Sequence, residues 1–205
     1  MTTHVEFDRL SSALAVWHRY DPTVKAELFS TSIQTASGVY LIDPISLPAE
    51  DLSTAIAGRD LAGIVITNRN HARSALAFSR ELKIPIFAHP EAAAEFGSNE
   101  IRLLDDGSRL ALDFVVATIE GAAAGEIALH CEADGGTLVF GDALINMGAE
   151  GFTFLPAKYC LNPKQMRASL RKFRDYRFQR ILFAHGTPII SRAESRLAEL
   201  LDSGR

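Results

Sequence analysis

The chain has 205 residues, of which 47% are hydrophobic and 22% are charged, and its formal net charge is −4. This length and composition suit one globular domain with a sizeable core, so we expect a single domain over residues 1–205. The weakly acidic balance excludes the basic surface typical of proteins that bind nucleic acid or anionic lipid, and no apolar run approaches the ~18 residues of a membrane helix.

The first half of the chain predicts strands that alternate with helices. An alternating run and an apolar run, separated by a polar turn, indicate an antiparallel strand pair. Helical spacing follows, with a proline near the start and a glycine near the end. The predicted strands are residues 27–34, 38–43, 63–67 and 84–88, and the predicted helices are residues 48–57, 71–82 and 90–95.

The second half predicts strands with tighter connections. Glycines in residues 133–136 supply the positive φ that a hairpin needs, and Ser191 is a capping residue for the last helix. The predicted strands are residues 108–112, 114–119, 126–131, 136–141 and 179–184, and the predicted helices are residues 163–173 and 191–201. Because tight turns join several neighbours, an α/β (α+β) arrangement of two sheets flanked by helices is favoured over one doubly wound parallel sheet.

The most informative segment is the loop that follows the predicted strand at residues 63–67. Residues 67–73 read T-N-R-N-H-A-R. This segment resembles T-H-x-H-x-D-H, the first metal-ligand loop of the metallo-β-lactamase fold superfamily, to which glyoxalase II-like proteins belong. Four further segments resemble that family in the same order, at residues 38–43, 121–129, 139–142 and 181–186. The resemblance implies a four-layer αββα sandwich over nearly the whole chain.

The same resemblance implies that most metal ligands are replaced. Zinc binds imidazole, thiolate and carboxylate, so a carboxamide is a poor substitute, and the fixed positive charge of Arg73 disfavours a cation nearby. We therefore expect no metal cofactor; the alternative is one zinc or iron ion. Asn68, Asn70, Ala72, Arg73 and Ala122 stand at the expected ligand positions, and Asp142 and His185 are the two retained ligand residues, which leaves them as weak candidates.

These positions converge at one end of the strands in the family's fold. Asp142 is expected to be a partly buried carboxylate there, and Arg73 is its expected ion-pair partner, because an unpaired buried charge is costly. The cluster is either only a stabilising plug or a pocket for a small polar or anionic ligand. Its predicted members are Asn68, Asn70, Arg73, Asp142 and His185.

Other residues with reactive or aromatic side chains have structural interpretations. His71 falls on a spacer position of the family loop, so we expect it to point away from the centre and to cap or pack at the helix start. His89 precedes a helix and is interpreted as a cap, whereas His130 lies in an alternating strand and is expected to face solvent. Trp17 and Tyr20 are expected to form a core or interface aromatic pair.

The two cysteines, Cys131 and Cys160, have no short-range partner, and residues 1–9 lack the apolar core of a signal peptide. We therefore expect reduced thiols and a cytoplasmic protein. Both thiols are interpreted as packing groups rather than nucleophiles, since no base is evident beside either.

Two functional hypotheses from different classes follow. The first is a non-metallic pseudoenzyme that acts as a small-ligand, regulatory or assembly module. The second is a metal-dependent hydrolase of the ester, thioester or lactone type with a reduced, weakly held metal site. Without a metal-bound water the family's hydrolytic route lacks its nucleophile, so enzymatic activity stays open. Neither hypothesis involves nucleic acid or a membrane, and a homo-oligomer is compatible with both.

Overall fold

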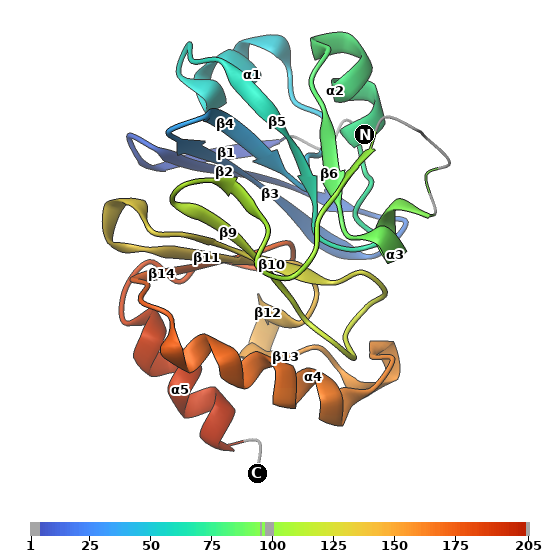
Figure 1. Ribbon diagram of the computed structural model, residues 1–205, viewed down its shortest axis with the longest axis vertical. Helices are drawn as coiled ribbons and strands as arrows, with labels where there is room; N and C mark the ends of the chain where they lie inside the picture. The colour runs from blue at the N-terminus through green and yellow to red at the C-terminus, as the bar shows by residue number, and fades with distance from the viewer. Residues whose placement is uncertain (1–4, 95, 97–100, 204–205) are drawn as a thin grey trace.

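The computed structural model describes residues 5–94, 96 and 101–203. Two β-sheets pack face to face and helices cover both outer faces, which gives a four-layer αββα sandwich (Figure 1). The fold expected from the sequence is therefore confirmed. No helix within the described ranges is long and apolar enough to cross a membrane.

The first sheet has seven strands that follow chain order from β1 to β7. Strands β1 to β4 pair antiparallel, and β4 to β7 pair parallel. Parallel neighbours need crossover connections, and helices provide the first two of these. The strands are β1 (Glu6–Ser11), β2 (Leu14–Asp21), β3 (Ala26–Thr35), β4 (Gly38–Ile42), β5 (Leu61–Ile66), β6 (Ile86–Ala88) and β7 (Ile101–Leu103), and the helices are α1 (Ala49–Ile56), α2 (Ala75–Leu82) and α3 (Pro90–Ala93).

The second sheet has five strands in the order β14-β11-β10-β9-β8, and a separate hairpin of β12 and β13 follows β11. Its outer face is covered by α4 and α5 (Figure 1). The strands are β8 (Arg109–Ala111), β9 (Phe114–Thr118), β10 (Ile127–Cys131), β11 (Thr137–Phe140), β12 (Leu144–Met147), β13 (Gly151–Phe154) and β14 (Arg180–Phe183). The helices are α4 (Pro163–Leu170) and α5 (Ala193–Ser203), and the 3-10 helices are η1 (Ala133–Gly135), η2 (Gly148–Glu150), η3 (Ala157–Tyr159) and η4 (Arg171–Asp175).

Three apolar clusters explain why the central strands read as continuous hydrophobic runs. In β4, Tyr40 packs between the two sheets while Leu41 packs under the helices of the first layer. In β11, Val139 faces the first sheet while Phe140 faces α4 and α5. Strands that are covered on both faces need apolar residues at every position.

The structure corrects several sequence-based predictions. His130 is buried rather than exposed, because its ring packs against Tyr176 and its Nε2 lies 2.9 Å from the Arg177 carbonyl oxygen. Trp17 is a core residue that donates to the Ile45 carbonyl oxygen at 3.1 Å, whereas Tyr20 is 44% exposed, so the two do not form the expected aromatic pair in the core.

Part of the predicted helix at residues 90–95 lies outside the described residues, since residue 95 is not among them. Strands β1, β2, β7, β12 and β13 were not predicted.

The sheet topology places the ends of four strands at one edge of the sandwich. Strands β4 and β5 are parallel in the first sheet, and β11 and β14 are parallel in the second. The residues that follow these strands are Asp43, Thr67, Asp142 and His185. Backbone contact joins the two sheets there, because Phe29 N donates to the Ala184 carbonyl oxygen at 2.9 Å. Polar side chains from both sheets therefore meet at this edge.

Candidate metal centre

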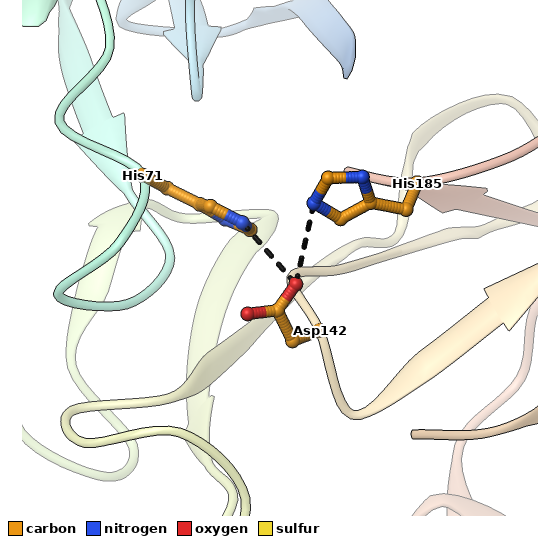
Figure 2. A group of neighbouring side chains, drawn as sticks. All are labelled: His71, Asp142 and His185. Carbon is orange, nitrogen blue, oxygen red and sulfur yellow. Dashed lines mark ion pairs between the residues drawn. The ribbon is translucent and has the colours of Figure 1, made fainter. Parts of the chain in front are cut away.

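Three side chains converge at this edge: His71, Asp142 and His185 (Figure 2). The Asp142 Oδ1 atom lies 3.2 Å from His71 Nε2 and 3.4 Å from His185 Nε2. One ligand atom from each residue lies within 4.8 Å of the other two. Two imidazoles and one carboxylate form a donor set that zinc and non-haem iron both accept.

Both imidazoles are oriented by a contact at the opposite ring nitrogen. His71 Nδ1 lies 2.9 Å from Asp43 Oδ2, and His185 Nδ1 lies 3.1 Å from the Glu27 carbonyl oxygen. Because these oxygens accept hydrogen bonds, each Nδ1 carries a proton and each Nε2 is directed at Asp142. Metal-binding histidines are commonly held in this way, by a carboxylate or a carbonyl on the ring nitrogen away from the ion.

Asp43 is held in place by Thr67, the residue that directly follows β5. Its Oδ1 accepts from Thr67 N at 2.8 Å, and its Oδ2 accepts from Thr67 Oγ1 as well as from the His71 ring. Burial raises the pKa of Asp43, but the neighbouring His71 and Arg73 outweigh burial and hold it below its ordinary value. Asp43 is therefore an ionised carboxylate that anchors His71.

Charge within the centre is balanced by its own side chains. Burial lowers the pKa of His71, but the carboxylates of Asp142 and Asp43 outweigh it and raise that pKa to about 9. Burial and the positive charge of His71 lower the pKa of His185 to about 4. Burial raises the pKa of Asp142, yet His71 and His185 hold it well below its usual range. In the protein alone, the cations His71 and Arg73 therefore offset Asp43 and Asp142.

Arg73 does not occupy its predicted place beside Asp142. Its Nη1 donates to the carbonyl oxygens of Phe29 and Asp43, and its Nη2 donates to the Ala184 carbonyl oxygen at 3.2 Å. Among the described residues, the ion pairs of Asp142 are with His71 and His185. The prediction of an Arg73–Asp142 pair was wrong, because the guanidinium donates instead to backbone carbonyl oxygens at the junction of the two sheets.

The prediction that His71 points away from the centre was also wrong. Helix α2 begins at Ala75, so residues 68–74 form an irregular loop rather than a helical turn. Within this loop His71 N donates to the Asn68 carbonyl oxygen at 3.1 Å, and Arg73 has a positive φ of 40°. Spacing along a motif does not fix side-chain direction in such a loop, and the carboxylates of Asp43 and Asp142 determine where His71 points.

Of the residues at the other expected ligand positions, Asn68 joins this cluster, whereas Asn70 and Ala122 do not. Asn70 is exposed and uses its backbone N–H to donate to Asn68 Oδ1 at 2.9 Å. Ala122 is fully buried in the apolar cluster under α4. Asn68 is fully buried, and its Nδ2 lies 3.0 Å from Asp142 Oδ2. Of the five predicted pocket residues, Asn68, Asp142 and His185 lie together, Arg73 borders them, and Asn70 faces solvent.

Sequence reasoning missed Glu126, which is 2% exposed. Its Oε1 accepts from the backbone N–H groups of Asp142 and Ala143 at 2.8 and 2.9 Å. Burial and the nearby charge of Asp142 raise the pKa of Glu126 to about 8. The sequence signal that could have identified Glu126 is its position as an acidic residue directly before the apolar strand β10, because an acidic group buried there needs hydrogen-bond partners.

The αββα sandwich carries histidine and aspartate side chains at the ends of its central strands. A family profile of the metallo-beta-lactamase superfamily matches residues 9–203, and the chain belongs to this family. No curated protein sequence matches the chain closely enough to count as a relative.

Solved structures support the same fold at low sequence identity. The DIM-1 metallo-beta-lactamase has a TM-score of 0.76 and 14% identity, with 98% of each chain covered. A metallo-beta-lactamase from Erythrobacter litoralis has a TM-score of 0.75 and 15% identity, with 97% of this chain and 96% of that chain covered. A metallo-beta-lactamase from Pontibacter korlensis has a TM-score of 0.74 and 16% identity, with 97% and 99% covered.

Proposed function

We propose that the protein is a metal-dependent hydrolase of the ester, thioester or lactone type with a single zinc or iron ion bound by His71, Asp142 and His185. The observation that carries this proposal is the convergence of two Nε2 atoms on one carboxylate oxygen. Asp142 and His185 were expected only as weak candidates, and the orientation of His71 supplies the third ligand. The sequence alone favoured a centre without metal, and that expectation is the competing proposal.

Two spacings within the ligand set are compatible with an ion. Zinc binds nitrogen and oxygen at about 2.0–2.2 Å, so neighbouring ligands of a tetrahedral ion lie about 3.3 Å apart. The distances from Asp142 Oδ1 to the two Nε2 atoms are 3.2 and 3.4 Å. A charge-assisted hydrogen bond between the same groups is shorter, about 2.7–2.9 Å. The spacing therefore resembles ligands around an ion more than a directly bonded ion pair.

The chain's own residues prepare this donor set. Asp43 and the Glu27 carbonyl oxygen keep a proton on each Nδ1, which leaves both Nε2 atoms as ligands. Asn68 engages Asp142 Oδ2 and leaves Oδ1 facing the imidazoles. When bound, the ion would lower the pKa of a water molecule and polarise a carbonyl group of the substrate. With Asn70 exposed and Ala122 without a donor atom, the described residues support one ion rather than two.

A second candidate function is the non-metallic pseudoenzyme, and the charge balance favours it. His71 lies between Asp43 and Asp142, and its pKa of about 9 makes it an imidazolium at neutral pH when no ion is bound. Together with Arg73, this cation neutralises both carboxylates without a metal. Such a centre would serve as a plug or as a pocket for a small polar or anionic ligand.

A cytoplasmic location and a homo-oligomer are proposed under either function. The free thiols of Cys131 and Cys160 support a reducing compartment.

Metal analysis of untagged protein separates the two candidates. We expect apo-protein reconstituted with zinc or cobalt(II) to bind one ion per chain, and the variants His71→Ala, Asp142→Ala and His185→Ala to lose it. His89→Ala is the matched control, since the His89 side chain accepts from Glu91 N at 3.3 Å and is not one of the three proposed ligands. A panel of esters, thioesters and lactones, with and without chelator, tests the activity. Protein that binds no ion and shows no chelator-sensitive turnover would refute the hydrolase and support the pseudoenzyme.

A further inference from the structure

We infer that Glu126 is a positioning residue for Asp142 and that it acts through the backbone of residues 142–143 and through Asn68. The inference rests on the proposed function, because Glu126 would orient the carboxylate of Asp142, which is one of the proposed ligands of the single ion. Glu126 contacts neither His71 nor His185 in the hydrogen bonds and ion pairs of the described residues, so its effect on the centre is indirect.

Sheet topology places the Glu126 carboxylate under the turn that carries Asp142. Strands β10 and β11 are antiparallel, so the residue before β10 lies beside the residues after β11. Glu126 Oε1 accepts from Asp142 N at 2.8 Å and from Ala143 N at 2.9 Å. Two hydrogen bonds to one carboxylate oxygen fix the direction in which the chain leaves β11. They therefore fix the base of the Asp142 side chain.

Close approach of this carboxylate requires the glycine at position 141. A Cβ atom added to Gly141 would lie 2.8 Å from Glu126 Oε1 and 2.6 Å from Thr67 Oγ1. Real Cβ atoms essentially never approach other atoms so closely, so a side chain at this position would displace one of the two groups. The Gly-Asp pair at the end of β11 is therefore matched to a carboxylate at position 126.

Asn68 connects Glu126 to the carboxylate head of Asp142. Its Nδ2 donates to Glu126 Oε2 at 2.7 Å and to Asp142 Oδ2 at 3.0 Å. The amide orientation is set by Asn68 Oδ1, which accepts from Asn70 N at 2.9 Å. A single amide group thus bridges the carboxyl groups of Glu126 and Asp142. Asp142 Oδ2 is engaged, and Oδ1 remains for the two imidazoles.

The arrangement depends on a carboxyl group rather than an amide at position 126, because both side-chain oxygens accept hydrogen bonds. A glutamine there could keep its oxygen on the two backbone N–H groups. Its Nε2 group would then face Asn68 Nδ2, and two donors cannot share a hydrogen bond. Glu126→Gln should therefore release Asn68 and Asp142 while it preserves the size of the side chain and its backbone contacts.

Glu126→Gln is compared with Glu120→Gln, which makes the same chemical change on the same loop. Glu120 is exposed and accepts from Gln165 Nε2 at 2.8 Å, away from the three ligands. The first measurement uses metal-free protein at one pH and records the ring ¹⁵N resonances of His71 and His185. The second is a cobalt(II) titration followed by absorption. Outer partners of ligands typically change metal affinity by ~10–100-fold.

We expect Glu126→Gln to shift the Nε2 resonances of both histidines and to weaken cobalt(II) binding ~10–100-fold, while Glu120→Gln leaves both unchanged. Folded Glu126→Gln protein with wild-type ring resonances would overturn the inference. If wild-type protein binds no cobalt(II) but the ring resonances still move in Glu126→Gln, the proposed function fails and the positioning role stands.

Asn68→Ala provides a second route if Glu126→Gln does not fold. This variant leaves the backbone bonds of Glu126 in place and removes the bridge to Asp142 Oδ2. It should shift the same histidine resonances. Unchanged resonances in folded Asn68→Ala protein would show that the bridge does not orient Asp142 and would refute the inference.

Discussion

The direction of each candidate ligand ring depends on an oxygen atom behind it. For His71 the acceptor is Asp43 Oδ2, at 2.9 Å from Nδ1, and Thr67 Oγ1 lies at the same distance from this nitrogen. In Asp43→Asn an amide nitrogen replaces one oxygen, so the side chain can no longer accept from both the Thr67 backbone and the His71 ring. We expect ~10–100-fold weaker binding of cobalt(II) or zinc, measured by competition with a chromophoric chelator. Asp60→Asn, at an exposed aspartate, is the control, and equal affinity in both variants would contradict the role of Asp43.

Arg73 is predicted to stabilise the junction between the sheets through its hydrogen bonds. Its guanidinium donates to the carbonyl oxygens of Phe29, Asp43 and Ala184. Arg73→Met removes the hydrogen bonds that a charged donor makes to these carbonyl oxygens, so we expect a loss of about 2–4 kcal/mol in the free energy of unfolding. Urea titration measures this change. Arg73→Lys should recover only part of the loss, because an ammonium group lacks the planar fork, and wild-type stability in Arg73→Met would sink the idea.

Single residues differ in how far the sequence could predict them. Asp142 and His185 follow strands β11 and β14, and strand ends at one edge of a sheet have predictable neighbours. His71 lies in a loop with irregular backbone dihedrals, where contacts with carboxylates determine the direction of its side chain. Its position in the family motif therefore predicted the wrong side-chain direction. Glu126 became apparent only when the antiparallel pairing of β10 and β11 was known.

The turn after β14 determines where His185 lies, and Gly186 is its critical residue. Gly186 has a φ of 113°, and it forms a bridge to Asn146 in β12. A Cβ atom at this position would overlap the Asn146 carbonyl group. We expect Gly186→Ala to lower the free energy of unfolding by about 2 kcal/mol or more and to weaken metal binding at His185.

Gly148→Ala is the matched control for this turn. Gly148 also has a positive φ, of 57°, but an added Cβ atom would meet nothing within 4 Å. Only the backbone preference is lost there, at a cost of about 1 kcal/mol. Denaturant unfolding of both variants separates strain from steric overlap. Equal losses would show that overlap with β12 is unimportant.

A pH-dependent contact joins the segment before β8 to η4. Asp106 Oδ1 accepts from Thr118 N at 2.8 Å and lies 3.5 Å from Lys172 Nζ. Burial raises the pKa of Asp106, but the Thr118 N–H and the Lys172 charge outweigh it and hold the pKa below its ordinary value. A lowered folded-state pKa stabilises the protein above the unfolded pKa of about 4 and is lost as pH falls. Asp106→Asn should therefore be less stable than wild type at pH 7, and the difference should shrink towards pH 3. A gap that is constant with pH would contradict this.

At the level of elements, the five strands of the second sheet and strands β3 to β6 of the first were predictable, whereas β1, β2, β7 and the β12–β13 hairpin were not. The runs that became β4, β5 and β11 are apolar on both faces because both faces are covered. Strands β1 and β2 carry charged residues at the sheet edge, and the two residues between them are Ser12 and Ala13, which lack the glycine or asparagine typical of a hairpin. Strand β2 pairs along its whole length with β3, the next strand in the chain.

The two cysteines differ in burial, so their reactivity measures how the two sheets of the sandwich separate on unfolding. Cys131 lies at the end of β10 in the cluster between the sheets, is 3% exposed, and has a pKa raised by burial to about 11. Cys160 lies in the connection before α4 and is only partly buried. At pH 8 a thiol with that pKa is about one part in a thousand thiolate, so both burial and protonation protect Cys131.

We therefore expect a thiol reagent at pH 8 to label Cys160 in the native protein and to reach Cys131 only when the two sheets separate. The rate of Cys131 labelling should rise with urea in parallel with the loss of circular dichroism, because one inter-sheet cluster joins both sheets and the sandwich should unfold as one cooperative unit. Peptide mapping by mass spectrometry distinguishes the two sites. Cys131→Ala serves as the control for assignment. Labelling of Cys131 well before the global transition would show that the second sheet opens on its own, contrary to this expectation.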